Sequence, residues 1–324
     1  DVSHMGQVIL RADSGKASDA ARALETLVPA DIVGLVEGRQ RYALFTNDDG
    51  GILDDLMVAN RGDHLFLVVN AARAAHDIAH LQDGLSGHGV TVEPVRNRAL
   101  LAVQGPLAEA VLSPHAADAA RMRFMDVCVT SSAFGEIWMS RSGYTGEDGY
   151  EISVPAANAE ALARALIGDP RVMSIGLGAR DSLRLEAGLC LYGSDIDETT
   201  TPVEAALTWS IGKARREGGD RSGGFPGADR ILREIAEGAP RKRVGLAPEG
   251  RAPMRAGTEI FDGDSQVGHV TSGAFGPSTG TPVSMGYVTA EHAATGTTLD
   301  GEVRGKRLPL RVADLPFVAP GFKR

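Results

Sequence analysis

The sequence predicts an α+β fold that ends in an all-β domain. Short apolar runs rich in β-branched residues alternate with helix-forming segments over the first two thirds of the 324 residues. From residue 242 onward, short strand patterns recur between Gly, Pro and Asp turns, which is typical of a small β-barrel or jelly roll. A chain of this length is expected to form two or three packed domains.

Local patterns place the individual elements in chain order. Period-two or continuous apolar runs predict strands at residues 7–10, 42–46, 52–59, 64–70, 99–103, 136–141 and 150–154. Helix formers with apolar residues three and four apart predict helices at 18–27, 71–85, 156–167 and 179–187. Residues 216–227 are rich in Gly and charge without periodicity, so we interpret them as a surface connection before a helix at 228–236.

Composition excludes several classes of function. The net charge of −9 argues against a nucleic-acid partner, because phosphate binding needs a basic surface. No apolar run reaches the length of about 18 residues that a membrane helix requires. Cys128 and Cys190 lack any metal-ligand spacing, and His76 and His80 lack the Glu of a zinc protease motif. We therefore expect no nucleic acid, no membrane and no metal.

Two adjacent acids interrupt an apolar strand that follows a glycine turn, in the segment GGILDDLMV at residues 50–58. Successive strand side chains point to opposite faces, so Asp54 and Asp55 are expected to diverge, with one facing a buried region. A buried carboxylate needs partners or a chemical role, since burying it unpaired costs several kcal/mol. The alternative is an edge strand with solvated carboxylates, and spacing does not decide between the two.

Two further segments carry candidate ligand groups. Glu151 begins a strand after the loop RSGYTGEDGY, where a fixed carboxylate can accept two parallel N–H bonds from a guanidinium or an aminopyrimidine edge. From the residues alone, a charged hairpin is the better explanation of that segment. Arg180 and Arg184 lie one turn apart on the predicted helix and suit a carboxylate ligand, or alternatively pair with Asp181 or Glu186. Neither a dinucleotide fingerprint nor a phosphate loop is present.

Together these motifs make the chain resemble the glycine cleavage T-protein family. The resemblance covers nearly the whole chain and is carried by Asp1–Gly6, Gly50–Leu56, Leu100–Pro106, Gly143–Glu151, Ala179–Gly193, Thr200–Glu204 and Val270–Gly273. It implies a three-domain cloverleaf with a ferredoxin-like domain and a C-terminal jelly-roll-like β domain. The implied domains are a split folate-binding domain at 1–8 and 98–227, the ferredoxin-like domain at 9–97 and the β domain at 228–324. Part of the first domain is expected to precede residue 1.

The resemblance also implies a reaction. It predicts a tetrahydrofolate-dependent aminomethyltransferase that takes an aminomethyl group from the lipoyl arm of the H-protein, releases ammonia and forms 5,10-methylenetetrahydrofolate. Tetrahydrofolate is then the acceptor substrate and the lipoylated H-protein the partner. The expected compartment is the cytoplasm for a bacterial source and the mitochondrial matrix for a eukaryotic one.

Residue roles follow from the matched motifs. Asp55 occupies the family's catalytic position, and Asp54 is its structural neighbour. Glu151 matches the acid that binds the aminopyrimidine edge of the pterin, and Arg180 the arginine of the same site. Further pocket residues implied by the resemblance are Tyr42, Asn70, Tyr144 and Phe322. The chain departs from the pattern at Ala59, where the family usually has tyrosine, so the expected pocket wall lacks that aromatic ring.

Two other functions compete with this prediction. The same folate cradle occurs in demethylating enzymes and in dimethylglycine or sarcosine oxidoreductases. The segment Cys190–Gly193 and the absence of a flavin-binding portion favour the T-protein. A folate-binding protein without transferase activity is the second alternative, and the presence of Asp55 within the acidic pair argues against it.

Overall fold

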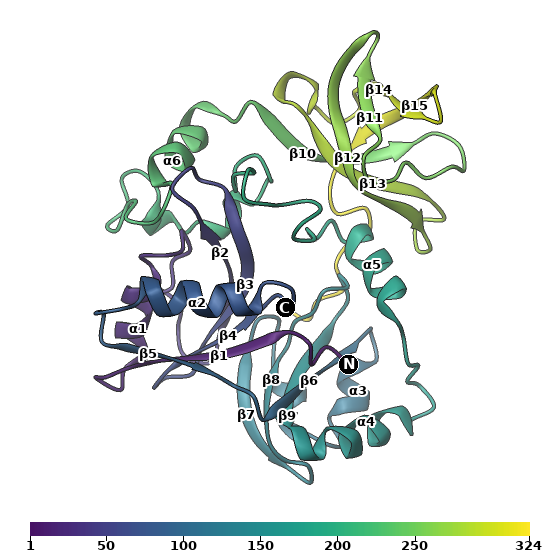
Figure 1. Ribbon diagram of the computed structural model, residues 1–324. Helices are drawn as coiled ribbons and strands as arrows, with labels where there is room; N and C mark the ends of the chain where they lie inside the picture. The colour runs from purple at the N-terminus through teal and green to yellow at the C-terminus, as the bar shows by residue number, and fades with distance from the viewer.

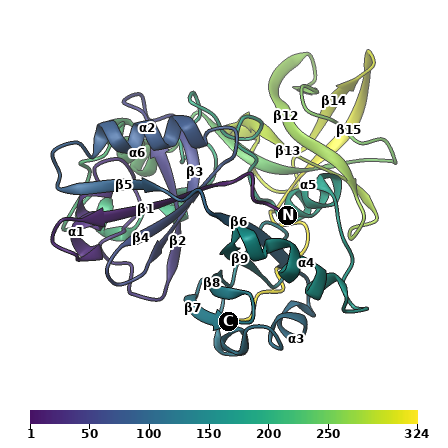
Figure 2. The same cartoon turned by 60° about the horizontal axis from the view of Figure 1, so that its bottom comes forward.

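The computed structural model describes residues 1–324 and is a mixed α/β protein with three antiparallel β-sheets. A five-stranded sheet has the order β2-β3-β4-β1-β5, and a four-stranded sheet has the order β6-β9-β8-β7. The third sheet closes into a six-stranded barrel, β10-β13-β12-β11-β14-β15. Figures 1 and 2 show these sheets as three separate parts of the molecule, with the barrel at the upper right. None of the helices is both long and apolar enough to span a membrane.

The five-stranded sheet has an apolar core on each face. Its elements are β1 (Gly6–Ala12), α1 (Ala17–Leu24), β2 (Gln40–Thr46), β3 (Ile52–Asn60), β4 (Leu65–Val69), α2 (Ala74–Gly84) and β5 (Val90–Pro94). On one face, α1 and α2 bury Leu24 and Leu81 against Leu10 and other strand residues. On the opposite face, Leu44 and Ile52 pack against residues 190–207. In β2, alternation sends Leu44 and Phe45 to opposite faces. In β3, a register shift after Ile52 places that residue on the face opposite Leu56.

The four-stranded sheet is covered by two helices. Its elements are β6 (Arg98–Gln104), α3 (Ala108–Leu112), β7 (Val127–Ser132), β8 (Gly135–Ser140), β9 (Gly149–Pro155) and α4 (Ala159–Ile167), with single 3₁₀ turns at Ala117–Arg121 and Ala156–Asn158. Leu162 and Leu166 of α4 pack on Ile152 and Val154, so the apolar positions of α4 and β9 form one core. This core also includes Leu112 of α3.

A long connection leads from α5 (Leu177–Glu186) to α6 (Ala228–Glu237) and then into the barrel. The barrel strands are β10 (Arg241–Pro248), β11 (Glu259–Asp262), β12 (Ser265–Gly276), β13 (Thr281–Thr289), β14 (Thr298–Val303) and β15 (Lys306–Ala313). Residues after β15 run back to the four-stranded sheet, where the backbone N–H of Phe124 donates to Lys323 O at 2.7 Å. The all-β C-terminal part expected from the sequence is thus a closed barrel.

The structure adds three elements that the sequence patterns did not reveal. These are α3, β5 and β7, and each is short or partly polar. β7 has the sequence VCVTSS and lies at the edge of its sheet, where side chains on one face stay in water. Such strands lack the apolar alternation on which the prediction depends.

Two of the predicted domain boundaries fall at points where the structure shows continuous contacts. β1 pairs as one continuous strand with β4 and β5, so a boundary after residue 8 falls inside it. α6 packs its Ile231 against Phe225, so a boundary between residues 227 and 228 divides one small core. The connection also stays on the five-stranded sheet, since Thr46 Oγ1 donates to Pro226 O at 2.8 Å. Contacts between apolar side chains determine which residues pack together, and the composition of a loop does not reveal those contacts.

Candidate active site

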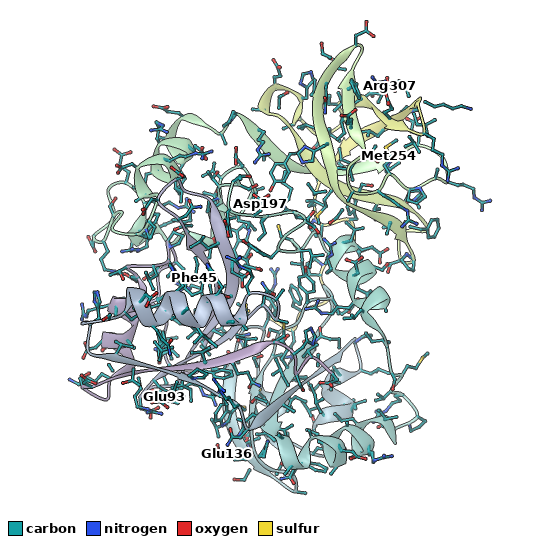
Figure 3. All side chains as sticks on the ribbon, viewed as in Figure 1. Phe45, Glu93, Glu136, Asp197, Met254 and Arg307 are labelled. Atoms are coloured by element: carbon teal, nitrogen blue, oxygen red, sulfur yellow. The ribbon has the colours of Figure 1, made fainter.

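Asp54 and Asp55 lie near the start of β3 and face opposite sides of the five-stranded sheet. Asp54 is fully buried on the face that packs under α2. Phe45, labelled beside α2 in Figure 3, lies on the same face, and its ring centroid is 5.0 Å from that of His80. Asp55 is half-buried and contacts Tyr42 on the other face. The alternation expected from the sequence is confirmed, and it excludes an edge strand with two solvated acids because β3 lies between β2 and β4.

Asn70 joins the two acids from the next strand. It directly follows β4, and the pairing of Leu56 with Val69 sets it beside the acidic pair. Its Nδ2 lies 2.9 Å from Asp54 Oδ1 and 2.6 Å from Asp55 Oδ1. A single amide group has two hydrogens to donate, so Asn70 can hold both carboxyl groups at once.

The environment of Asp55 raises its pKa to about 6. Burial is the main cause and the charge of Asp54 adds to it, whereas hydrogen bonds from Asn70 and Tyr42 oppose the rise. Tyr42 is itself held by an aromatic stack on Trp209, with ring centroids 5.3 Å apart. Asp55 is therefore a fixed carboxylate that is ionised at neutral pH and can still exchange a proton near it.

Tyr144 and Arg180 form a second group beside the first. The Arg180 guanidinium lies over the Tyr144 ring, with Cζ 4.4 Å from its centroid, and the Tyr144 hydroxyl donates to Cys190 O. Burial raises the pKa of Tyr144, and the negative charge of Asp55 adds to that rise. The two groups therefore lie close enough to interact electrostatically. A stacked guanidinium has a fixed plane and keeps donors for a ligand.

Glu151 stands at the start of β9, close to Arg180. Burial raises its pKa, and the positive charge of Arg180 opposes that rise. The Glu151 carboxylate has no hydrogen-bond donor of its own within the protein. A half-buried, partnerless carboxylate is suited to a ligand that brings paired N–H donors.

Arg184 does not join Arg180 as a second ligand group. It is buried and binds Asp195 Oδ2 at 2.6 Å, Asp181 Oδ1 at 2.8 Å and Ser272 Oγ at 2.9 Å. The pairing with Asp181 is one of the alternatives left open by the sequence. Asp195 and Ser272 are distant in sequence, so spacing gave no sign of them. Arg184 therefore fastens α5 to the barrel strand β12.

The sequence-predicted residues thus fall into one cluster and one outlier. The structure brings together Tyr42, Asp55, Asn70, Tyr144, Glu151 and Arg180. Phe322 instead stacks on Phe124, with centroids 3.9 Å apart. The residue before it, Gly321, donates its N–H to Gly146 O at 3.0 Å, so the chain end is tied to the loop that carries Tyr144.

Sequence reasoning missed Asp77 and Trp209. Asp77 lies on α2, is fully buried and contacts Asp54. Its spacing of four from the buried Leu81 was a usable signal, because an acid on the apolar face of a helix is unusual. Trp209 carried no such signal, since it lies in a single 3₁₀ turn and remains 64% exposed while stacking on Tyr42.

Comparisons with known proteins agree along the whole chain. Residues 1–215 match the GCVT N-terminal domain, and residues 241–319 match the glycine cleavage T-protein C-terminal barrel domain. The mitochondrial aminomethyltransferase of Homo sapiens is 45% identical over 331 residues, covering 99% of this chain and 79% of the relative. The mitochondrial enzyme of Dictyostelium discoideum is 40% identical over 342 residues, covering 100% of this chain and 82% of the relative.

A solved structure is similar over the same extent. The crystal structure of glycine cleavage system aminomethyltransferase T from Bartonella henselae superposes with a TM-score of 0.92 at 42% identity. The match covers 100% of this chain and 87% of that one.

Proposed function

This chain belongs to the glycine cleavage T-protein family and is an aminomethyltransferase, and we propose that it uses tetrahydrofolate as acceptor and lipoylated H-protein as donor. The observation that carries the proposal is the Asp55 carboxylate, fixed by Asn70 and Tyr42 and held at a pKa of about 6. Family members are named as mitochondrial or come from a bacterium, so we expect the matrix or the cytoplasm according to source.

Asp55 has the electrostatic role. Transfer of the one-carbon unit from the lipoyl sulfur to a folate nitrogen, with the amino group leaving as ammonia, develops positive charge near the moving carbon. A fixed anion lowers the energy of that arrangement. When bound, tetrahydrofolate supplies the nitrogen that accepts the one-carbon unit. Because Asp55 titrates near neutral pH, it can also accept the proton that the acceptor nitrogen must lose.

Glu151 and Arg180 have the orienting role. The Glu151 carboxylate lacks donors, and the aminopyrimidine edge of a pterin presents two parallel N–H groups of the required type. Arg180, stacked on Tyr144, supplies positive charge and donors at the same place. These groups would hold the ring so that its reactive nitrogens face Asp55. Phe322 is proposed to line the pocket by resemblance alone.

We propose that the three units surround this site in a cloverleaf. The residues come from β2, β3 and the end of β4 in the first sheet, from β9 and its preceding loop in the second, and from α5, which Arg184 ties to the barrel. Each unit thus supplies or supports part of the site. A pocket between units is a frequent place for a ligand.

A reconstituted assay tests the proposed function. The chain is incubated with tetrahydrofolate and aminomethyl-loaded H-protein, and ammonia and 5,10-methylenetetrahydrofolate are measured together. Appearance of both products in equal amounts, dependent on folate, is expected. Folate binding without either product would contradict the proposal and point to the demethylating or non-enzymatic relatives of the fold.

A further inference from the structure

Asp54 has a second acidic neighbour, Asp77 on α2. Both side chains are fully buried, with 0% exposure, and their carboxyl groups lie in hydrogen-bonding contact. Two carboxylates without a proton repel each other and offer only acceptors. A hydrogen bond between them therefore needs one bound proton.

The oxygens that lack a partner show where the proton belongs. Asp54 Oδ1 accepts from Asn70 at 2.9 Å, but Asp54 Oδ2 has no donor. On the other acid, Oδ1 lies 3.3 Å from His76 Nδ1, and Oδ2 has no donor. One proton placed between the two Oδ2 atoms would satisfy both.

The surrounding charges do not replace that proton. Arg73 favours the ionised form of Asp77, yet it donates no hydrogen bond to either acid. Its Nη2 lies 3.1 Å from Glu198, its guanidinium lies over the Tyr192 ring, and its buried Nε has no partner. Asp55 adds another negative charge on the far side of β3. His80 stacks on His76, one turn along α2, and its buried Nε2 has no partner in the protein.

Burial raises the pKa of both acids. The contact between them raises the pKa of Asp54 further, to about 8, and opposes the rise for Asp77, whose pKa is about 6. Two buried carboxyl groups in contact cannot both ionise at moderate cost, so a pair of this kind keeps one proton through neutral pH.

We propose that Asp54 and Asp77 share one proton through their Oδ2 atoms and act as a positioning unit for Asp55. The shared proton ties β3 to α2 and leaves Asp54 Oδ1 free to accept from Asn70. Asn70 then has its second hydrogen directed at the Asp55 carboxylate. The pair contributes one negative charge beside Asp55 in place of two, so Asp55 stays ionised near neutral pH. The positioning part rests on the proposed function, whereas the shared proton stands by itself.

Infrared difference spectroscopy on the intact chain tests the shared proton without any assay of activity. Wild type at pH 7 should show the C=O stretch of a protonated carboxylic acid that Asp54→Asn and Asp77→Asn both lack. In either variant the new amide replaces the O–H donor, and the remaining acid is ionised. Asp83→Asn, an exposed change on the same helix, should leave the band in place. Retention of the band in both buried variants overturns the shared proton.

The pH profile of transfer tests the positioning role. Asp54→Asn keeps one negative charge on the pair, so the acid limb assigned to Asp55 should stay within a few tenths of a pH unit of wild type. If both acids were ionised, removing one charge would move that limb down by about one unit or more, which would overturn the proposal. Asp54→Asn should also restore most of the rate lost in Asp54→Ala, because only the amide keeps both contacts.

The two ideas fail in distinguishable ways. Suppose that both buried variants lose the protonated-acid band, but the wild-type transfer rate does not fall near the pKa of Asp55. That result would refute the role of Asp55 and support the shared proton. If both variants retain the band and the wild-type rate does fall near that pKa, the shared proton would be refuted and the role of Asp55 supported. If Asp54→Asn folds poorly, the infrared band and the pH profile of transfer can both be measured on Asp77→Asn instead.

Discussion

The side-chain Nδ2 of Asn70 lies 2.6 Å from Oδ1 of Asp55, although the two residues are 15 positions apart. The contact exists because β3 and β4 pair with Leu56 opposite Val69, which sets the first residue after β4 beside the acid. A hydrogen bond to a charged group contributes about 1.5–3 kcal/mol, so this contact is large enough to set both the position and the pKa of Asp55.

The first prediction concerns Asn70→Ala. Losing the donor should raise the pKa of Asp55 above about 6, because the hydrogen bond from Asn70 opposes the effect of burial. The acid limb of the transfer rate is expected to move up by about one to two pH units. The measurement is the rate of methylenetetrahydrofolate formation between pH 5 and 8. Asn97→Ala, an exposed change, is the control, and an unmoved limb in Asn70→Ala would contradict the prediction.

The second prediction concerns Asp55→Asn. The change is nearly isosteric and removes the charge, so transfer should fall by about 10²–10⁴-fold while folate binding is kept. The wild-type rate should decline as pH falls below about 6, where Asp55 becomes protonated, and this decline should be absent in the variant. Asp48→Asn, in the exposed turn before β3, should behave as wild type. Unimpaired turnover in Asp55→Asn would remove the catalytic role.

The third prediction concerns Glu151→Gln. Glutamine offers one acceptor oxygen and adds an NH₂ donor that faces the N–H groups of the ligand, so folate should bind about 10- to 100-fold more weakly. Burial raises the pKa of Glu151, and N–H donors favour its ionised form, so wild-type affinity should weaken as pH falls through that pKa. Fluorescence titration with tetrahydrofolate measures both effects. Glu160→Gln changes an exposed carboxylate on α4 and should leave affinity unchanged, whereas equal affinity in Glu151→Gln would exclude the proposed contact.

The sequence was informative wherever a local pattern determines the outcome. The alternation around Asp54 and Asp55 predicted that one acid is buried, and Asp54 is. Glu151 and Arg180 needed the family resemblance, because their meeting depends on how β9 and α5 pack. Arg184 shows the limit most clearly. Its strongest partner, Asp195, lies beyond α5 at a point that no spacing rule selects.

The contact between Asp54 and Asp77 was likewise outside the reach of pattern analysis. Asp54 interrupts the apolar strand β3, and Asp77 lies with Leu81 on the buried side of α2. The helix crosses over the strand only in the folded chain, so the pairing is a tertiary feature. Trp209 is similar, since its stack on Tyr42 joins segments far apart in sequence.

The fourth prediction is a dependence of stability on pH that arises from Asp54. Its folded-state pKa of about 8 exceeds the unfolded value of about 3.9, so between these values the folded chain binds a proton that the unfolded chain lacks. The free energy of unfolding should therefore fall as pH rises, by up to about 1.4 kcal/mol per pH unit for this one proton. The interval from pH 7 to 8 reports Asp54 with the least interference, because Asp55 and Asp77, whose pKa values are about 6, are largely ionised there.

Urea unfolding at pH 6, 7 and 8 measures this slope. Asp54→Asn has no such proton to release, so its free energy of unfolding should change less with pH. The difference in stability between wild type and this variant should therefore shrink toward pH 8. Asp48→Asn should run parallel to wild type, because its side chain is exposed in the turn before β3. Parallel curves for wild type and Asp54→Asn would mean that Asp54 is already ionised at pH 6. In that case the repulsion between two buried carboxylates would have to be offset by groups other than Asn70, Arg73 and His76, and the structure places no such donor at either Oδ2 atom.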